Sequence, residues 1–126
     1  MTVKDFYTML FGEFNPFEFE RYLGERLSCG DAAERKLERR TAAYMVHTFL
    51  CEVLKEADEP SIEPAFLLKD IYECPSCIRY IAQVYLKGIM PGRNQLFGVK
   101  DLVGEDEAEQ IVARVLDKSK RSWTWI

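Results

Sequence analysis

The sequence predicts an all-α fold, a small multi-helix domain formed by one unit of 126 residues. Three observations lead to this prediction. Apolar residues recur at three- and four-residue spacing along most of the chain, capping signals precede these periodic stretches, and no strand-length alternation of apolar and polar residues occurs. Strand and helix patterns also do not alternate as they do in parallel α/β proteins, so the all-α class is favoured.

The composition is that of a globular domain, with 48% hydrophobic and 30% charged residues. The net charge of -4 provides no positive field for phosphates, so we expect no nucleic-acid partner. The first residues lack a basic segment followed by an apolar run, and no stretch approaches the ~18 apolar residues of a membrane span. We therefore expect no membrane association and a cytoplasmic location, or the cell surface if the chain is a fragment of an exported protein.

Residues 1–30 predict two short helices. Thr2 and Asp5 have the spacing of a capping box in front of a periodic stretch over 3–11. Asn15 and Pro16 then read as a cap and a first helical residue, and Gly24 predicts the end of that helix.

Aromatic side chains are in surplus near the N-terminus, and two tryptophans stand close to the end of the sequence. Their number exceeds what a two-helix lobe can easily bury, and surplus aromatic side chains often form interfaces. The alternative is that they close the core of the domain. On the first reading we expect a homo-oligomer or a protein partner, and the candidate interface residues are Phe11, Phe14, Phe17, Trp123 and Trp125.

Residues 31–65 predict one long helix and a linker. The apolar stripe that includes Leu37, Met45 and Leu50 favours a helix from about Asp31 to near Ala57. Pro60 and Pro64 prevent its continuation.

Residues 66–118 predict two more helices around an ordered loop. Pro75 opens the first, and Gly88 supplies a residue that can turn left-handed and end it. Glycines punctuate the stretch from Ile89 to Gly104, which we expect to be a loop folded over the helices. The last helix is expected from about Glu105 to Lys118, followed by a tail over 119–126.

The order of motifs in this second half resembles an S-layer homology repeat. The motifs are Lys69-Asp70-Ile71, a helix ending in Gly88-Ile89-Met90, Phe97-Gly98 with Asp101, and a helix containing Ile111 to Leu116. The match covers roughly Phe66 to Asp117, and Leu37 to Ala43 is similar to the second helix of the family. The resemblance implies about one and a half repeats with helix-loop-helix lobes.

Repeats of this family anchor exported proteins by binding anionic cell-wall polysaccharide, through the arginine of a Thr-Arg-Ala-Glu type signature. In the C-terminal repeat of this chain that signature reads Gly104-Glu105-Asp106-Glu107, so an acid stands where the arginine is expected. An acid would repel an anionic sugar. Arg39 alone matches the arginine, and its guanidinium could hold a carboxylate through two parallel hydrogen bonds.

Cysteine and histidine offer the remaining chemistry. Cys74-Pro75-Ser76-Cys77 places a cysteine at a helix start, where free amides favour the thiolate, so thiol redox or metal binding through Cys74 and Cys77 is one alternative. A four-thiolate zinc site would need Cys29 and Cys51, which are separated by most of a helix. The other reading of this segment is a capped helix start with one buried thiol, since a cytoplasmic location argues against structural disulfides.

His47 is the single histidine, and the sequence places no Ser, Cys or carboxylate at a spacing typical of a catalytic set. We interpret it as a partly buried structural residue and Cys51 as a small core residue. The prediction from the sequence is therefore a non-catalytic protein-protein interaction or scaffolding module with no cofactor. Polysaccharide binding through Arg39 and thiol or metal chemistry through Cys74 and Cys77 are the alternatives.

Overall fold

The computed structural model describes residues 1–27 and 32–124. Within these ranges the chain is mostly helical and forms no β-strand, which confirms the all-α class. The α-helices are α1 (Val3–Phe11), α2 (Pro16–Leu27), α3 (Arg39–Glu52), α4 (Ile78–Leu86) and α5 (Glu105–Leu116). The 3-10 helices are η1 (Ala32–Glu34), η2 (Glu63–Leu67), η3 (Ile71–Glu73), η4 (Pro75–Cys77) and η5 (Lys118–Lys120).

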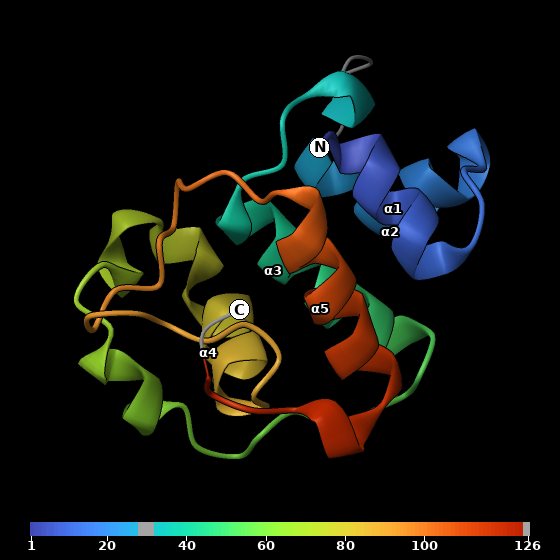
Figure 1. Ribbon diagram of the computed structural model, residues 1–126. Coiled ribbons are helices and arrows are strands. Elements are labelled where there is room, and N and C mark those ends of the chain that lie inside the picture. The colour runs from blue at the N-terminus through green and yellow to red at the C-terminus, as the bar shows by residue number, and fades with distance from the viewer. Residues whose placement is uncertain (28–31, 125–126) are drawn as a thin grey trace.

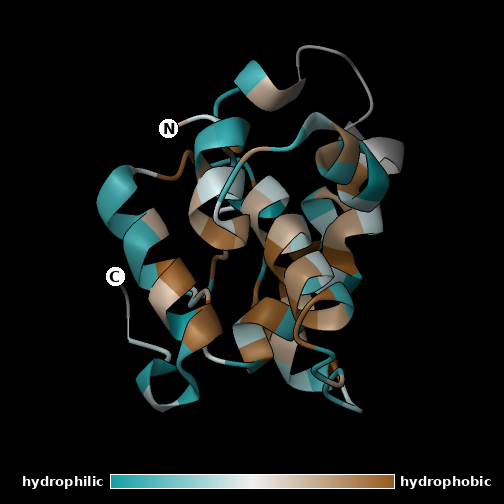
Figure 2. Cartoon of the chain, turned by 90° about the vertical axis from the view of Figure 1, so that its right-hand side faces the viewer, coloured by the Kyte–Doolittle hydropathy of each residue, from teal (hydrophilic) through white to brown (hydrophobic). Residues whose placement is uncertain are grey.

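Helix α3 is the central element (Figure 1). It packs mainly against α4 on one side and α1 on the other, and α2 also contacts it. Helix α5 contacts α1 and completes the enclosure of the core. Figure 2 shows the hydrophobic parts of the helices gathered toward the middle of the molecule and the hydrophilic parts mostly outside. None of the helices in the described part of the chain is both long and apolar enough to cross a bilayer.

The predicted starts of the first two helices are confirmed. Thr2 and Asp5 form a reciprocal capping box, in which each side chain accepts a hydrogen bond from the backbone amide of the other, at 3.1 and 3.0 Å. The side-chain oxygen of Asn15 accepts from the amides of Phe17 and Glu18 at the start of α2. Helix α2 continues to Leu27, so the predicted end near Gly24 is wrong.

The predicted long helix is shorter than its apolar stripe. Helix α3 begins at Arg39, because the preceding segment is extended and pairs its backbone with distant segments. The amide of Val3 donates to the carbonyl of Arg35 at 2.9 Å, and the amide of Val103 donates to the carbonyl of Leu37 at 2.9 Å. Backbone groups that bond across the fold in this way are not available for a helix.

The C-terminal end of α3 also comes earlier than the predicted Ala57. After Glu52 the chain turns through Lys55, whose φ of 54° lies in the left-handed region. The amide of Glu56 donates back to the carbonyl of Leu50 at 2.8 Å, which closes this turn. The segment that follows therefore returns beside α3 toward α4.

The expected loop from Ile89 to Gly104 is confirmed as an ordered segment pinned to the core. Ile89 and Phe97 are fully buried, and Gly88 and Gly98 have φ angles of +72° and +82°, which favour glycine. The carboxylate of Asp70 holds the loop by accepting from the amides of Phe97, Gly98 and Val99 at 2.7 to 3.2 Å.

The helices that flank this loop lie close to their predicted positions. Pro75 opens the short helix η4, which leads directly into α4. Helix α5 starts at Glu105 as predicted and ends at Leu116, two residues before the predicted Lys118.

Candidate metal centre

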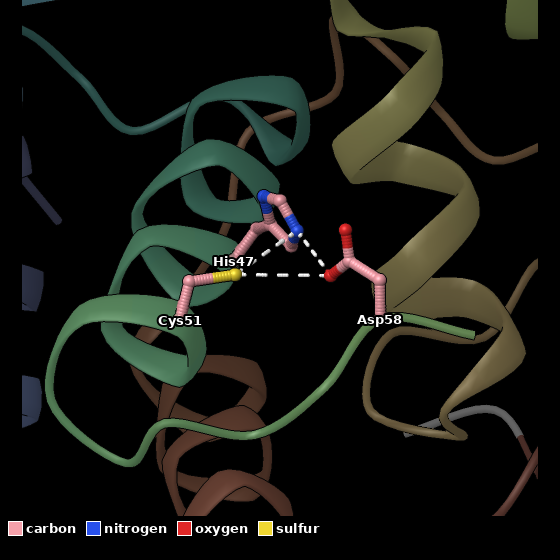
Figure 3. Close-up of side chains that lie close together, drawn as sticks. All are labelled: His47, Cys51 and Asp58. Atoms are coloured by element: carbon pink, nitrogen blue, oxygen red, sulfur yellow. Dashed lines mark hydrogen bonds and ion pairs between the residues drawn. The ribbon is translucent and has the colours of Figure 1, made fainter. Parts of the chain in front are cut away.

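Three side chains able to ligate a metal meet beside the C-terminal half of α3 (Figure 3). His47 Nε2 lies 2.8 Å from Asp58 Oδ1 and 3.4 Å from Cys51 Sγ, and this sulfur lies 3.7 Å from the same Asp58 oxygen. All three residues are partly buried. We call these three residues the histidine cluster.

Helix geometry brings His47 and Cys51 together. Residues four apart in an α-helix lie one above the other on the same face, so the ring and the sulfur project from α3 in one direction. The four-residue spacing of His47 and Cys51 is visible in the sequence and could have predicted their contact.

Asp58 joins them because the segment after α3 is tied to α4. The Gln83 side chain accepts from the amide of Glu59 at 2.7 Å and donates to its carbonyl at 3.1 Å. Lys87 Nζ donates to the carbonyl of Ala57 at 2.7 Å. Gln83 of α4 and Lys87, the residue that follows α4, are both buried, so these side chains hold the backbone on either side of Asp58 in place.

An ion-pair network also anchors the segment that follows α3. Arg121 makes two hydrogen bonds to the carboxylate of Glu56, at 2.8 and 2.9 Å, and Lys87 Nζ lies 2.9 Å from that carboxylate. The hydrogen bonds from Arg121 outweigh the effect of burial and, with Lys87, lower the pKa of Glu56 to about 2. Glu56 is therefore a fixed negative charge that anchors the turn.

The protonation of the histidine cluster follows from its surroundings. Burial, followed by the nearby charge of Asp58, raises the pKa of the Cys51 thiol, so the thiol is protonated at neutral pH. Burial acts to raise the pKa of Asp58 as well, but the hydrogen bonds with His47 and Arg79 outweigh it and the pKa lies below its ordinary value. The second oxygen of Asp58 accepts from Arg79 at 3.1 Å.

The arrangement differs from a Cys-His-Asp nucleophilic triad. In a triad the nucleophile and the acid contact opposite nitrogens of the imidazole ring. Here Cys51 and Asp58 both approach Nε2. The Cys51 thiol also has a raised pKa, whereas an activated cysteine needs a lowered one. The three side chains place their ligand atoms within 4.8 Å of one another, close enough for all three to reach one metal ion.

Two of the three separations agree with tetrahedral zinc coordination. Zinc bonds of about 2.0 to 2.3 Å at tetrahedral angles place neighbouring ligand atoms roughly 3.4 to 3.6 Å apart. The distances from Cys51 Sγ to His47 Nε2 and to Asp58 Oδ1 are 3.4 and 3.7 Å. Only the 2.8 Å separation of His47 and Asp58 would need to open, by roughly half an ångström, when a metal replaces their shared proton.

The cluster is reachable from one side. His47 and Cys51 line a cavity of about 440 Å³ between α2, α3 and α4. Three protein ligands leave one of four tetrahedral positions for water or another ligand. The other residues that line the cavity are Arg21, Tyr22, Tyr44, Thr48, Glu52 and Arg79.

Arg39, the expected ligand-binding arginine, lies in the interior instead. Its side chain is 1% exposed. Its Nε donates to the carbonyl of Phe97 at 2.8 Å, one terminal nitrogen donates to the carbonyl of Pro91 at 2.7 Å, and the other pairs with Glu107. The guanidinium also stacks over the Phe97 ring at 4.7 Å. This geometry gives Arg39 a role in holding α3, the loop and α5 together, and it leaves no accessible face for a polysaccharide.

Cys74 and Cys77 are joined by a disulfide, with their Cα atoms 5.2 Å apart. The helix start predicted at Pro75 is present and Cys77 is buried, but its sulfur is bonded to Cys74, so the prediction of a free buried thiol without a disulfide is wrong. Oxidised cysteines are not metal ligands, because the ligand is the thiolate. Cys29, the further thiol considered for a zinc site, lies outside the described residues.

The expected interface residues divide into two groups. Phe11 stacks on Tyr7 at 4.3 Å and Phe14 packs against Phe19 at 5.4 Å, so these two rings contribute to the core. Phe17 and Trp123 are 86% and 59% exposed. Trp125 lies outside the described residues.

Comparison of the chain with known protein families, curated proteins and solved structures finds no match. The resemblance to the S-layer homology repeat therefore stays a prediction.

Proposed function

We propose that this domain is a binding module whose histidine cluster holds a divalent transition-metal ion, with zinc the best fit. The observation that carries the proposal is the convergence of a sulfur, a ring nitrogen and a carboxylate oxygen within 4.8 Å of one another. Mixed sulfur, nitrogen and oxygen ligands suit zinc and cobalt better than calcium or magnesium, which prefer oxygen alone.

Support also comes from the way the ligands are held. Gln83 and Lys87 fix the backbone around Asp58, and Arg79 orients the carboxylate through its other oxygen. Partners of this kind are what orient metal ligands in proteins. The ligands come from α3 and from the segment after it, so a bound ion would cross-link these two parts of the chain.

The test is a titration of the purified protein with Co²⁺, followed by displacement with Zn²⁺, in a buffer free of thiol reductants. Cobalt bound to a thiolate gives a near-ultraviolet charge-transfer band, so the spectrum reports whether a cysteine is a ligand. We expect one equivalent of cobalt with this band, and its loss when zinc is added. Absence of the band at saturating cobalt would contradict the proposal.

Matched variants localise the site. Cys51→Ser should abolish the charge-transfer band, and Asp58→Asn should weaken binding by at least roughly tenfold, since even the loss of a supporting residue commonly costs that much. Cys29→Ser and the double variant Cys74→Ser/Cys77→Ser remove the sulfur atoms of the other cysteines and should bind as the native chain does. An unchanged band in Cys51→Ser would place the metal at another site.

A second candidate function is protein-protein contact through exposed aromatic side chains. Phe17 is almost fully exposed, and the rings of Phe66 and Tyr72 stack at the surface with their centroids 5.8 Å apart. Exposed aromatic rings are enriched in interfaces. Sedimentation of the native chain and of Phe17→Ser tests self-association: a native dimer that the variant dissociates supports it, and a native monomer at every concentration argues against it.

A further inference from the structure

The Cys74–Cys77 disulfide forms part of the wall of a second cavity, which Tyr44 and Tyr80 also line. This cavity, of about 270 Å³, lies between the segment before α3 and the start of α4. It is distinct from the cavity at the histidine cluster, and the Tyr44 and Tyr80 rings that bound it pack edge to face with centroids 5.0 Å apart. We name it the disulfide cavity.

The two cysteines differ in accessibility. Cys77 is 4% exposed, whereas Cys74 is only partly buried and lies beside the exposed Ser76, whose Oγ is 3.7 Å from the Cys74 sulfur. Cys77 is also held by a 2.8 Å hydrogen bond from its amide to the carbonyl of Cys74. A pair with one accessible and one protected sulfur is suited to exchange, because an incoming partner can reach one sulfur and the other can then displace it.

The charge of the disulfide cavity selects the kind of partner. Among the residues that the structure describes, Arg35, Lys36 and Arg40 line it together with one acid, Glu38, which pairs with Arg40 at 2.9 Å. Positive charge beside the cysteines stabilises a thiolate and attracts an anion. The volume suits part of a small molecule rather than a folded protein.

We propose that Cys74 and Cys77 exchange reversibly with small thiols and disulfides that carry carboxylates, the chemical class to which glutathione belongs. In the reduced chain the Cys74 thiolate attacks one sulfur of the external disulfide, that S–S bond breaks, and one thiolate leaves and takes up a proton. Cys77 gives up its proton and attacks the Cys74 sulfur, which expels the second thiol and forms the Cys74–Cys77 bond. Two electrons pass from the protein to the external disulfide, and two external thiols in excess reverse the sequence.

This role is independent of the metal proposal, since it uses other cysteines and another cavity. The first experiment incubates the reduced protein with glutathione disulfide in the presence of a chelator, quenches with acid and maps adducts by mass spectrometry. In Cys77→Ser we expect the mixed disulfide to accumulate on Cys74. In Cys74→Ser we expect no adduct on Cys77, and adducts of equal yield on the two cysteines would overturn the proposal. Circular dichroism checks that both variants are folded.

The second experiment tests the charge of the disulfide cavity. Lys36→Gln should slow exchange with glutathione disulfide roughly tenfold, the lower end of electrostatic steering effects. Exchange with the uncharged hydroxyethyl disulfide should keep its native rate. The matched control is Lys100→Gln, an exposed lysine that does not line this cavity, and it should change neither rate. Equal slowing with both disulfides, or native rates with both, would overturn the proposed selectivity for anions.

Discussion

Helix α3 carries a polar cluster in each half, and the two clusters differ in how completely their groups are bonded within the protein. At the start, Arg39 is buried and bonds to Glu107 and to the carbonyls of Phe97 and Pro91; we call these four residues the arginine cluster. About two turns further on, roughly 12 Å along the helix axis, His47 and Cys51 line a cavity and meet Asp58. The arginine cluster joins three segments, whereas the histidine cluster leaves its ligand atoms turned toward a common point.

The comparison teaches that burial and polarity alone do not mark a functional site. A buried charge surrounded by partners specifies the packing of the chain around it. A partly buried set of ligand atoms beside a cavity can exchange its bound protons for a metal. The predictions below test this division, from the largest expected effect to the smallest.

Arg39→Met should have the largest effect on folding. It leaves the Glu107 carboxylate and two buried carbonyls without the guanidinium, and loss of one partner of a buried pair costs about 3–5 kcal/mol. Urea unfolding measures this change in the free energy of unfolding. The matched control is Arg40→Met, because the neighbouring arginine is partly exposed and pairs with Glu38, so its loss should cost less than about 1 kcal/mol. A similar loss of unfolding free energy in both variants would show that the buried bonds of Arg39 contribute no more than the partly exposed pair of Arg40.

Asp58→Asn should leave the fold of the metal-free protein nearly unchanged but reduce its stabilisation by metal. A ligand at a hundred times its Kd stabilises the folded state by about 2.7 kcal/mol. Thermal unfolding with and without Zn²⁺ should therefore show a shift in Tm for the native chain that falls to about half or less in the variant, as a Kd at least tenfold weaker requires. Glu105→Gln, an exposed acid at the start of α5, should keep the full shift.

Metal binding should also weaken as the pH falls. The pKa of the Cys51 thiol is raised, so binding at neutral pH releases a proton from this thiol, and higher proton concentration opposes binding. Calorimetric titrations in buffers of different ionisation enthalpy measure the proton released. Binding that is independent of pH and releases no proton would exclude the thiolate as a ligand.

Glu56→Gln should destabilise the metal-free protein less than Arg39→Met does. Loss of its charge should cost about 1–2 kcal/mol, which allows for solvent screening of a pKa lowered from 4.5 to about 2. Because the folded pKa is the lower one, this stability is present above about pH 4.5 and is lost as the pH falls toward 2. Urea unfolding across that range should show a stability difference between native and variant chains that shrinks with acidification. A constant difference would argue against the charge of Glu56 as its source.

Phe17→Ser should have the smallest effect on folding, within about 0.5 kcal/mol, because the ring is almost fully exposed. Phe6→Ser is the matched comparison, since that ring is fully buried in α1 and its loss should cost several kcal/mol, about 3–5. A large cost at Phe17 would mean that the isolated chain uses this ring to close its core.

Locally encoded features were predictable from the sequence. The capping pair Thr2 and Asp5, the proline at the start of α2, and the left-handed glycines Gly88 and Gly98 act within a few residues of themselves, so their patterns gave the helix starts and the corners of the loop. The pairing of His47 with Cys51 belongs to the same class, because it needs only the period of one helix.

Tertiary contacts decided the rest. Asp58 reaches His47 only because Lys55 turns left-handed and Gln83 and Lys87 hold the returning chain, and none of these contacts is written in the spacing of the ligands. The segment before α3 is extended because its backbone bonds to Val3 and Val103, although its apolar stripe favours a helix. Arg39 is paired with Glu107, 68 positions away, and the Cys51 thiol faces Asp58, 7 positions away. Only the packed chain brings these residues together.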